Sequence, residues 1–192
     1  MTTQVQIQRH PERSVPEQAP EILAEGRVAH VGFCLEGKPY VLPFSYHYDR
    51  QIPDRLYLHG SVASRTLRHL ATGAPVCVEV TMLDGLVFSK SAKYHSMNYR
   101  SVVCFGTSSI ISDPAEKCRI FERAIQRYFP GRTEGQHYSA ATLAHLKQTT
   151  LLEITITEWS AKTRTGGPKG PTDTDPHATG TSGVLEFDSS RG

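Results

Sequence analysis

Apolar and polar residues alternate through much of the middle of the chain, and this period of two predicts β-strands with one buried face. Every second residue is apolar in residues 28–35, and the turn-forming residues 36–39 separate this strand from the next, over residues 40–48. We expect these two strands to pair as a hairpin. Residues 56–59 then predict a third strand, and residues 75–82 a fourth.

The later strands are marked by glycines as well as by alternation. A fifth strand is predicted to begin after the turn-like sequence Leu83-Asp84-Gly85. Residues 101–111 are apolar on both faces and interrupted by Gly106, as expected for a barrel strand that must bend. The last barrel strand is predicted around residues 152–156 and ends near Trp159.

Helical periodicity is strongest after Asp113, which is predicted to cap a helix that has Pro114 in its first turn. An apolar stripe at helical spacing follows, and we interpret it as core packing rather than a cofactor surface. Shorter helices are predicted over residues 20–25 and 139–147. The stripe consists of Cys118, Phe121, Ile125 and Tyr128.

The two ends of the chain differ from its middle in composition. Residues 1–19 are polar, contain Pro11 and Pro16 and show no periodicity, which predicts a loosely held arm, whereas residues 20–160 are expected to form one domain. Residues 161–192 are rich in glycine and proline but include the apolar sequence 184–187. We therefore expect an irregular C-terminal arm that docks near the functional pocket.

Composition excludes several classes of protein. The chain has 192 residues and a net charge of +2, and its basic residues are scattered, so nucleic acid is not an expected partner. Without an apolar run of membrane length or a secretory leader pattern, we expect a soluble, cytoplasmic protein. The sequence contains no Cys-x-x-Cys spacing, so it predicts no structural zinc site. The four cysteines, expected to be buried free thiols, are Cys34, Cys77, Cys104 and Cys118.

The junction after the third strand carries candidate chemistry. Gly60 ends the strand, and a short helix follows with Ser61, Ser64 and Arg65 at its start. Hydroxyls, a guanidinium and unpaired backbone N–H groups together suit a phosphate group. The alternative is that the serines only cap the helix while Arg65 is solvated.

The sequence from His59 to Arg65 resembles the phosphate-binding turn of the FMN-binding split barrels, the pyridoxamine 5′-phosphate oxidase-like superfamily. Thr66 stands where that family usually has lysine, which removes one charge. The likeness extends over about residues 20–187. It is closest to the predicted flavin-nucleotide-binding branch that includes the Nim-type nitroimidazole-resistance proteins, through the further motifs at residues 37–43, 95–103 and 166–169.

The resemblance implies a mainly β fold with flanking helices, a six-stranded antiparallel split β-barrel, and a homodimer with pockets at the interface. It implies FMN as cofactor, rather than FAD, F420 or haem. The phosphate would lie on the serines and Arg65, and the ring between residues 42–45, His59 and residues 96–100. The expected cofactor-binding residues are Leu42, Pro43, Phe44, Ser45, His59, Ser61, Ser64, Arg65, Thr66, Ser96, Asn98, Tyr99 and Arg100.

The function implied is electron-pair or hydride transfer between the flavin and a small molecule, with His59 as the candidate for proton delivery. A non-catalytic flavin-binding or sensing protein is the alternative. His59 could equally be a structural histidine, and Arg100 a dimer-interface ion pair. No Ser/His/Asp or Cys/His order supports a covalent nucleophile. Pyridoxamine phosphate oxidation is disfavoured because residues 161–192 contain no Arg-x-His clamp.

Overall fold

The computed structural model describes residues 6–187 and is built around a ring of six antiparallel strands in the order β1-β2-β3-β6-β5-β4, closed by pairing of β4 with β1. A seventh strand adds to the outer part of β4. The strands are β1 (Val28–Leu35), β2 (Lys38–Tyr48), β3 (Arg55–Ser61), β4 (Pro75–Phe88), β5 (Ser96–Ile111), β6 (Thr149–Arg164) and β7 (Gly183–Glu186). The α-helices are α1 (Ala19–Glu25), α2 (Arg65–Leu70), α3 (Pro114–Tyr128) and α4 (Leu143–Gln148).

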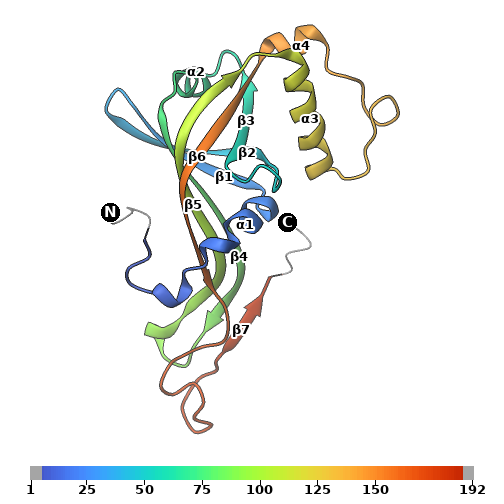
Figure 1. The fold of residues 1–192 in the computed structure, drawn as a ribbon. Coiled ribbons are helices and arrows are strands. Elements are labelled where there is room, and N and C mark those ends of the chain that lie inside the picture. Colours follow the sequence, from blue (N-terminus) through green and yellow to red (C-terminus); the bar gives the residue numbers. More distant parts are fainter. Residues whose placement is uncertain (1–5, 188–192) are drawn as a thin grey trace.

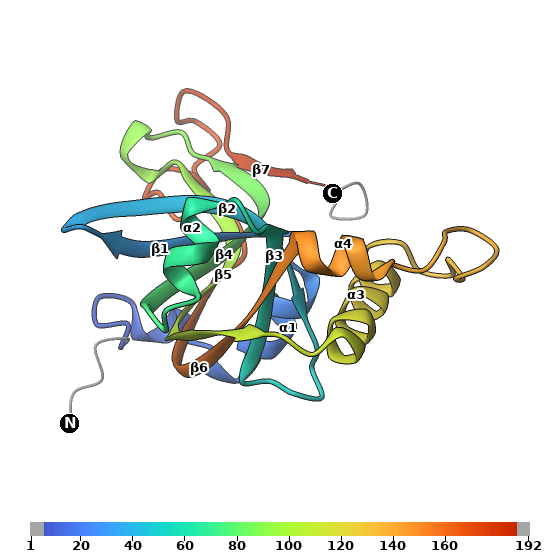
Figure 2. The ribbon, with the colours of Figure 1, turned by 90° about the horizontal axis from the view of Figure 1, so that it is seen from above.

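The long strands β5 and β6 run through the whole molecule (Figure 1), with α2 and α4 at one end and the β4–β5 hairpin at the other. Seen along the barrel, α2 and α3 lie on opposite sides of the ring (Figure 2). α3 packs beside β2, and its Ile120 contacts Tyr57 of β3. The split-barrel prediction is therefore confirmed. The flanking helices leave part of the outer face of the sheet uncovered.

The core lies inside the ring, where the inward-facing residues of every barrel strand meet. Alternation places Leu56 and Leu58 of β3 in this core, whereas Tyr57 packs on the outer side against Ile120 of α3. Tyr46 is also fully buried and donates a hydrogen bond to the carbonyl of Leu23. Its desolvated phenol has a pKa raised to about 12. The first helix is thereby fastened to the barrel.

The predicted turn at Leu83-Asp84-Gly85 is wrong, because β4 continues without a break from Pro75 to Phe88. The irregularity is a β-bulge between Leu83 and Gly85, opposite continuous residues of β5. At Gly85 a Cβ atom would lie 2.8 Å from the carbonyl oxygen of Leu185. Glycine therefore allows the close approach of β7 rather than a chain reversal.

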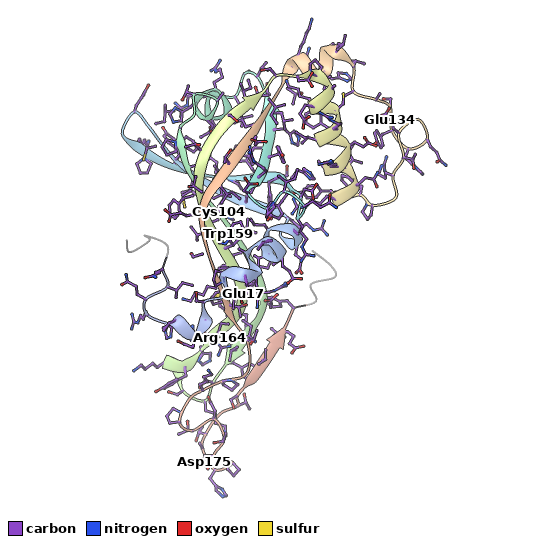
Figure 3. All side chains as sticks on the ribbon, viewed as in Figure 1. Glu17, Cys104, Glu134, Trp159, Arg164 and Asp175 are labelled. Carbon is purple, nitrogen blue, oxygen red and sulfur yellow. The ribbon has the colours of Figure 1, made fainter. Side chains whose placement is uncertain are left out.

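β5 is continuous through Gly106, but its register against β6 shifts between Phe105 and Gly106, where the sequence predicted a bend. A side chain at Gly106 would overlap the carbonyl group of Thr155 on β6. Trp159 and Cys104 pair across the same two strands, and Figure 3 labels both near the middle of the molecule. The bend is thus built into the longest pair of strands.

The long helix α3 begins as predicted, because the Asp113 carboxylate accepts hydrogen bonds from the N–H groups of Ala115 and Glu116. The predicted core stripe is only partly correct. Ile120 is buried, but Cys118 is exposed, so the packed face is rotated relative to the prediction. The shorter α4 begins at Leu143, four residues later than predicted, where Thr142 and His145 form a capping box.

Both ends of the described chain pack on the barrel. The Val15 N–H donates to the carbonyl of Ala161 at 2.9 Å, which ties residues 6–18 to β6. On the C-terminal side, Asp173 accepts hydrogen bonds of 2.8 Å from the Ser89 hydroxyl and the Lys90 N–H. Figure 3 shows Asp175 at the far tip of this loop, from which the chain returns as β7.

The cysteines are all free, as predicted, but only Cys104 is buried. Cys34 and Cys118 are exposed and Cys77 is half-buried, so the predicted burial is wrong for the two exposed thiols. Among residues 6–187, no helix is long and apolar enough to cross a membrane.

Candidate functional site

The predicted ring-binding residues of β2 divide between the two faces of the strand. Leu42 and Phe44 are half-buried against the barrel core, whereas Pro43 and Ser45 are exposed on the outer face. Tyr46 pairs with Leu58 of β3, so the next outward positions are Ser45 and His59. An outward strip that includes Pro43, Ser45 and His59 therefore leads toward Ser61 at the end of β3.

The predicted phosphate turn follows this strip directly. Ser61 Oγ accepts from the Ala63 N–H at 3.1 Å, and Ser64 Oγ caps α2 by accepting from the Leu67 N–H at 3.3 Å. In both contacts the serine oxygen is the acceptor, so its own O–H remains able to donate to a ligand. The capping alternative is correct for Ser64, and it does not exclude a phosphate contact.

Arg65 extends from the turn toward β2, and its side chain remains exposed. Its guanidinium donates to the Tyr40 hydroxyl at 3.3 Å and lies 5.5 Å from the centroid of the Tyr40 ring. This cation–π contact holds the side chain beside the serines while leaving other guanidinium donors free. Thr66 is half-buried next to it.

The segment from Ser96 to Arg100 lies at the other end of β5. Ser108, on the same strand, donates to the carbonyl of Leu70 in α2, and up to about 26 Å of extended strand separates Ser108 from Arg100. The structure of one chain therefore does not bring this segment to the turn at residues 61–66. Ser96 is exposed, and Tyr99 is half-buried.

The polar side chains of this segment have partners within the chain. Arg100 donates to both carboxylate oxygens of Asp84 and also pairs with Glu25, and these contacts raise its pKa. The Asn98 side-chain oxygen accepts from Arg164. Arg100, considered from the sequence as part of an ion pair at a dimer interface, already has two acidic partners within its own chain.

Arg164 was not singled out in the sequence, although it is buried and labelled in Figure 3 near the lower part of the barrel. Its guanidinium also donates to the carbonyls of Gly166 and Gly167, at 3.0 and 3.1 Å. Burial lowers its pKa. The only signal in the sequence is its place at the end of a strand just before the Gly-Gly-Pro motif.

A hollow of about 440 Å³ opens between the outer faces of β2 and β3 and the helix α3. Within the described part of the chain, no lysine, arginine or carboxylate side chain belongs to its lining. The half-buried stripe residues Phe121, Ile125 and Tyr128 line this hollow, and Phe121 also packs against the buried cluster of Tyr57, Ile120 and Leu151. Among the described residues, Ile125 and Tyr128 belong to neither core cluster, so the predicted core packing is correct only for Phe121. The lining consists of Ser45, Tyr46, His47, His59, Phe121, Ala124, Ile125, Tyr128 and Phe129.

His59 lies at the mouth of this hollow. Its ring meets Phe121 edge to face, with centroids 5.4 Å apart and planes at 75°. Within the described chain its side chain makes no hydrogen bond. The ring is open to solvent on one side, but the protein atoms around it partly desolvate it and lower its pKa, which favours the neutral imidazole.

His47, which the sequence analysis missed, lies deeper in the same hollow. It is 7% exposed, and neither ring nitrogen has a hydrogen-bond partner in the described structure. Burial, reinforced by the charge of Arg127, lowers its pKa to about 4. The available signal was its outward position in β2, two residues after Ser45. Within residues 6–187, no group of three or more His, Cys, Asp or Glu side chains is placed to hold a metal ion.

A closed ring of six antiparallel strands with flanking helices is the architecture of a split barrel. Residues 16–163 match the family model described as pyridoxamine 5′-phosphate oxidase, and the chain belongs to this family. A comparison with curated protein sequences finds no match.

Solved structures extend the likeness over most of the chain. The FAD and haem binding protein from Mycobacterium smegmatis is 34% identical over 91% of this chain and 84% of its own, with a TM-score of 0.81. The flavocytochrome Anf3 from Azotobacter vinelandii is 29% identical over 97% of this chain and 85% of its own, with a TM-score of 0.84.

A protein assigned to 5-nitroimidazole antibiotic resistance from Bacteroides thetaiotaomicron shares the fold. It is 20% identical over 78% of this chain and 85% of its own, with a TM-score of 0.63. The predicted likeness to the Nim-type branch is confirmed at the level of the fold.

Proposed function

We propose that this chain binds a flavin nucleotide and exchanges an electron pair with a small molecule at the flavin ring. The observation that carries the proposal is the uncovered outward strip of β2 and β3, which leads from the hollow to two serine hydroxyls and Arg65. Val41 and Val62 lie near its far end and are 67% and 44% exposed. A planar ring laid on this strip would bury apolar surface while its phosphate reaches the turn.

The turn favours FAD over the FMN expected from the sequence. An FMN phosphate is a dianion, and here only Arg65 supplies charge, because Thr66 replaces the usual lysine. The diphosphate of FAD carries the same total charge but divides it between two phosphorus atoms, so the guanidinium would need to meet only one singly charged group while the hydroxyls donate to the other. The name of the M. smegmatis relative supports the same choice.

A homodimer would complete the proposed site. Residues 96–100 lie far from the turn in one chain, so a second copy could bring them to the flavin. Exposed apolar side chains near this end of the molecule support such an interface. They are Leu83, Leu86, Phe88, Met97 and Leu185, between 37% and 56% exposed.

His59 is the proposed proton donor and acceptor, because its neutral imidazole stands at the edge of the strip beside Ser45. A bound flavin supplies the electron-pair chemistry, and the protein binds it, orients it and limits its contact with water. The competing function is flavin binding without turnover, for which the same strip would suffice.

Haem binding in addition to flavin is a second candidate. It is supported by the names of two relatives and by the two neutral histidines, His47 and His59, in one apolar hollow. An imidazole nitrogen free of other partners, in apolar surroundings, is what a haem iron requires from a protein. His59, which is exposed, would be the more accessible of the two as an iron ligand.

Spectroscopic titration of the purified full chain with FAD, FMN, F420 and haemin tests these proposals together. We expect FAD to bind at least as tightly as FMN, with haemin giving a Soret shift if the second candidate is correct. Reduction by NADH or NADPH is then followed in stopped flow. No binding of any flavin would refute the proposal, and binding without reduction above the rate of free flavin would favour the non-catalytic alternative.

A further inference from the structure

The hollow beneath α3 contains a buried side chain whose polar atoms are unused. His47 stacks on Tyr57 at a centroid distance of 5.8 Å, and both of its ring nitrogens lack hydrogen-bond partners within the described residues. Buried polar groups in native proteins are almost always bonded, so such a group calls for a partner that the chain alone does not provide.

His47 belongs to the lining of the hollow, although neither ring nitrogen is solvent-accessible in the ring orientation of the structure. Rotation by 180° about the Cβ–Cγ bond exchanges nitrogen and carbon positions within the same ring outline. Burial disfavours a proton on this ring, Arg127 and Arg123 add to this effect, and among the described residues Asp49 opposes it. Neutral His47 therefore offers one N–H donor to an acceptor atom in the hollow.

The rest of the lining determines the chemistry of the occupant. Phe121, Tyr128 and Phe129 contribute aromatic rings, and no charged side chain of residues 6–187 belongs to the lining. Such walls favour a flat ring system, because aromatic packing adds to the burial of apolar surface. The exposed members of the lining are Ser45, His59 and Phe129, so the mouth lies next to the proposed flavin strip.

We propose that this hollow is a binding site for a planar aromatic molecule with a ring carbonyl, whose oxygen accepts a hydrogen bond from His47. The site adjoins the proposed flavin position and goes beyond flavin binding, and a protein that fails to bind flavin could still have it.

The test compares two probes that differ in the carbonyl groups. Anthraquinone-2-sulfonate has ring carbonyls and no position that reacts with the exposed thiols, and anthracene-2-sulfonate has the same rings without carbonyls. Calorimetric titration of the full chain should show the anthraquinone binding about tenfold tighter, the effect of one hydrogen bond to a buried partner. Equal affinity for the two probes, or binding of neither, would overturn the proposal.

Variants separate the hydrogen bond from the ring contacts. His47→Phe should reduce the tenfold preference to about one, and His47→Gln, which keeps a donor, should retain part of it. Phe121→Ala should weaken both probes equally. A preference that survives in His47→Phe would overturn the role of His47.

A third measurement needs no variant. The ¹⁵N shift of His47 should move on addition of the anthraquinone and not of anthracene, and no movement would contradict the proposal. If haemin displaces the anthraquinone and its Soret spectrum depends on His47, the hollow is instead a haem site. A parallel titration with flavin tests the flavin proposal separately from the aromatic site.

Discussion

His47 and Tyr57 face each other across β2 and β3, paired in register and stacked with their ring planes 27° apart. Because this histidine is buried without a partner, it is neutral in the folded protein, with a pKa of about 4 against an ordinary value of 6.5. Its environment therefore links folding to pH.

The sign of this linkage follows from the lowered pKa. Above pH 6.5 the histidine is neutral in both states, whereas between pH 6.5 and about 4 the unfolded chain binds the proton more readily. We predict that the protein loses about 1–3 kcal/mol of stability through His47 as the pH falls across this range. Urea denaturation at pH 7.5 and pH 5 should show this loss of stability in the wild type and a smaller loss in His47→Phe. The control His177→Gln should show the same loss as the wild type. An unaltered pH dependence in His47→Phe would contradict the assignment.

Arg127 holds the end of α3 to the first helix. It donates to the carbonyls of Leu23, Ala24, Gly26 and Tyr46, and its guanidinium lies 4.3 Å from the Tyr46 ring centroid. We predict that Arg127→Ala lowers the free energy of unfolding by about 3 kcal/mol, because buried carbonyls lose a charged donor. Arg123→Ala, on the same helix, removes only an exposed pair with Asp49 and should change it by less than about 1 kcal/mol. Chemical denaturation measures the free energy of unfolding of both variants. Equal losses in Arg127→Ala and Arg123→Ala would contradict the role of Arg127 in holding α3 to the first helix.

The bend in β5 depends on Gly106. Alanine at this position would overlap the carbonyl of Thr155, and neither strand can move without breaking barrel pairing. We expect Gly106→Ala to destabilise the fold by about 1–3 kcal/mol or more. Gly167→Ala meets nothing within 4 Å and provides the control for thermal unfolding. If the thermal unfolding midpoint of Gly106→Ala were as high as that of Gly167→Ala, the two strands would have adjusted to the added side chain without cost.

Arg65 is the only charged group in the proposed phosphate turn. Arg65→Ala should weaken flavin binding by about 1.5–3 kcal/mol, which is roughly a 10- to 150-fold rise in Kd. Arg68→Ala removes an exposed arginine from the same short helix and should leave the affinity unchanged. Fluorescence titration measures both, and matching affinities for the two variants would place the phosphate elsewhere.

The dimer proposal is tested on its apolar surface. Met97→Glu should shift the protein from dimer to monomer in light scattering at micromolar concentration, because a charge would be buried at the interface. Leu143→Glu places the same charge on a residue that is 66% exposed in α4, at the other end of the molecule, and should have no effect. A wild-type protein that is monomeric with and without flavin would refute the proposal.

The sequence by itself determined the features that depend on neighbouring residues. Alternation located the barrel strands, Asp113 and Pro114 located the start of α3, and Gly106 marked the bend in β5. The order of residues 59–66 also identified the turn, since caps and turns are satisfied within a few residues of themselves.

Tertiary structure decided everything that depends on a partner distant in sequence. Asp84 and Gly85 form a bulge because β5 and β7 pair on both sides of β4 and keep it extended. The apolar stripe of α3 faces an open hollow because only contact with β3 fixes which side of the helix is buried. His47 lies unpaired in that hollow for the same reason: the alternation of β2 places it outside the barrel, but only the position of α3 removes it from water.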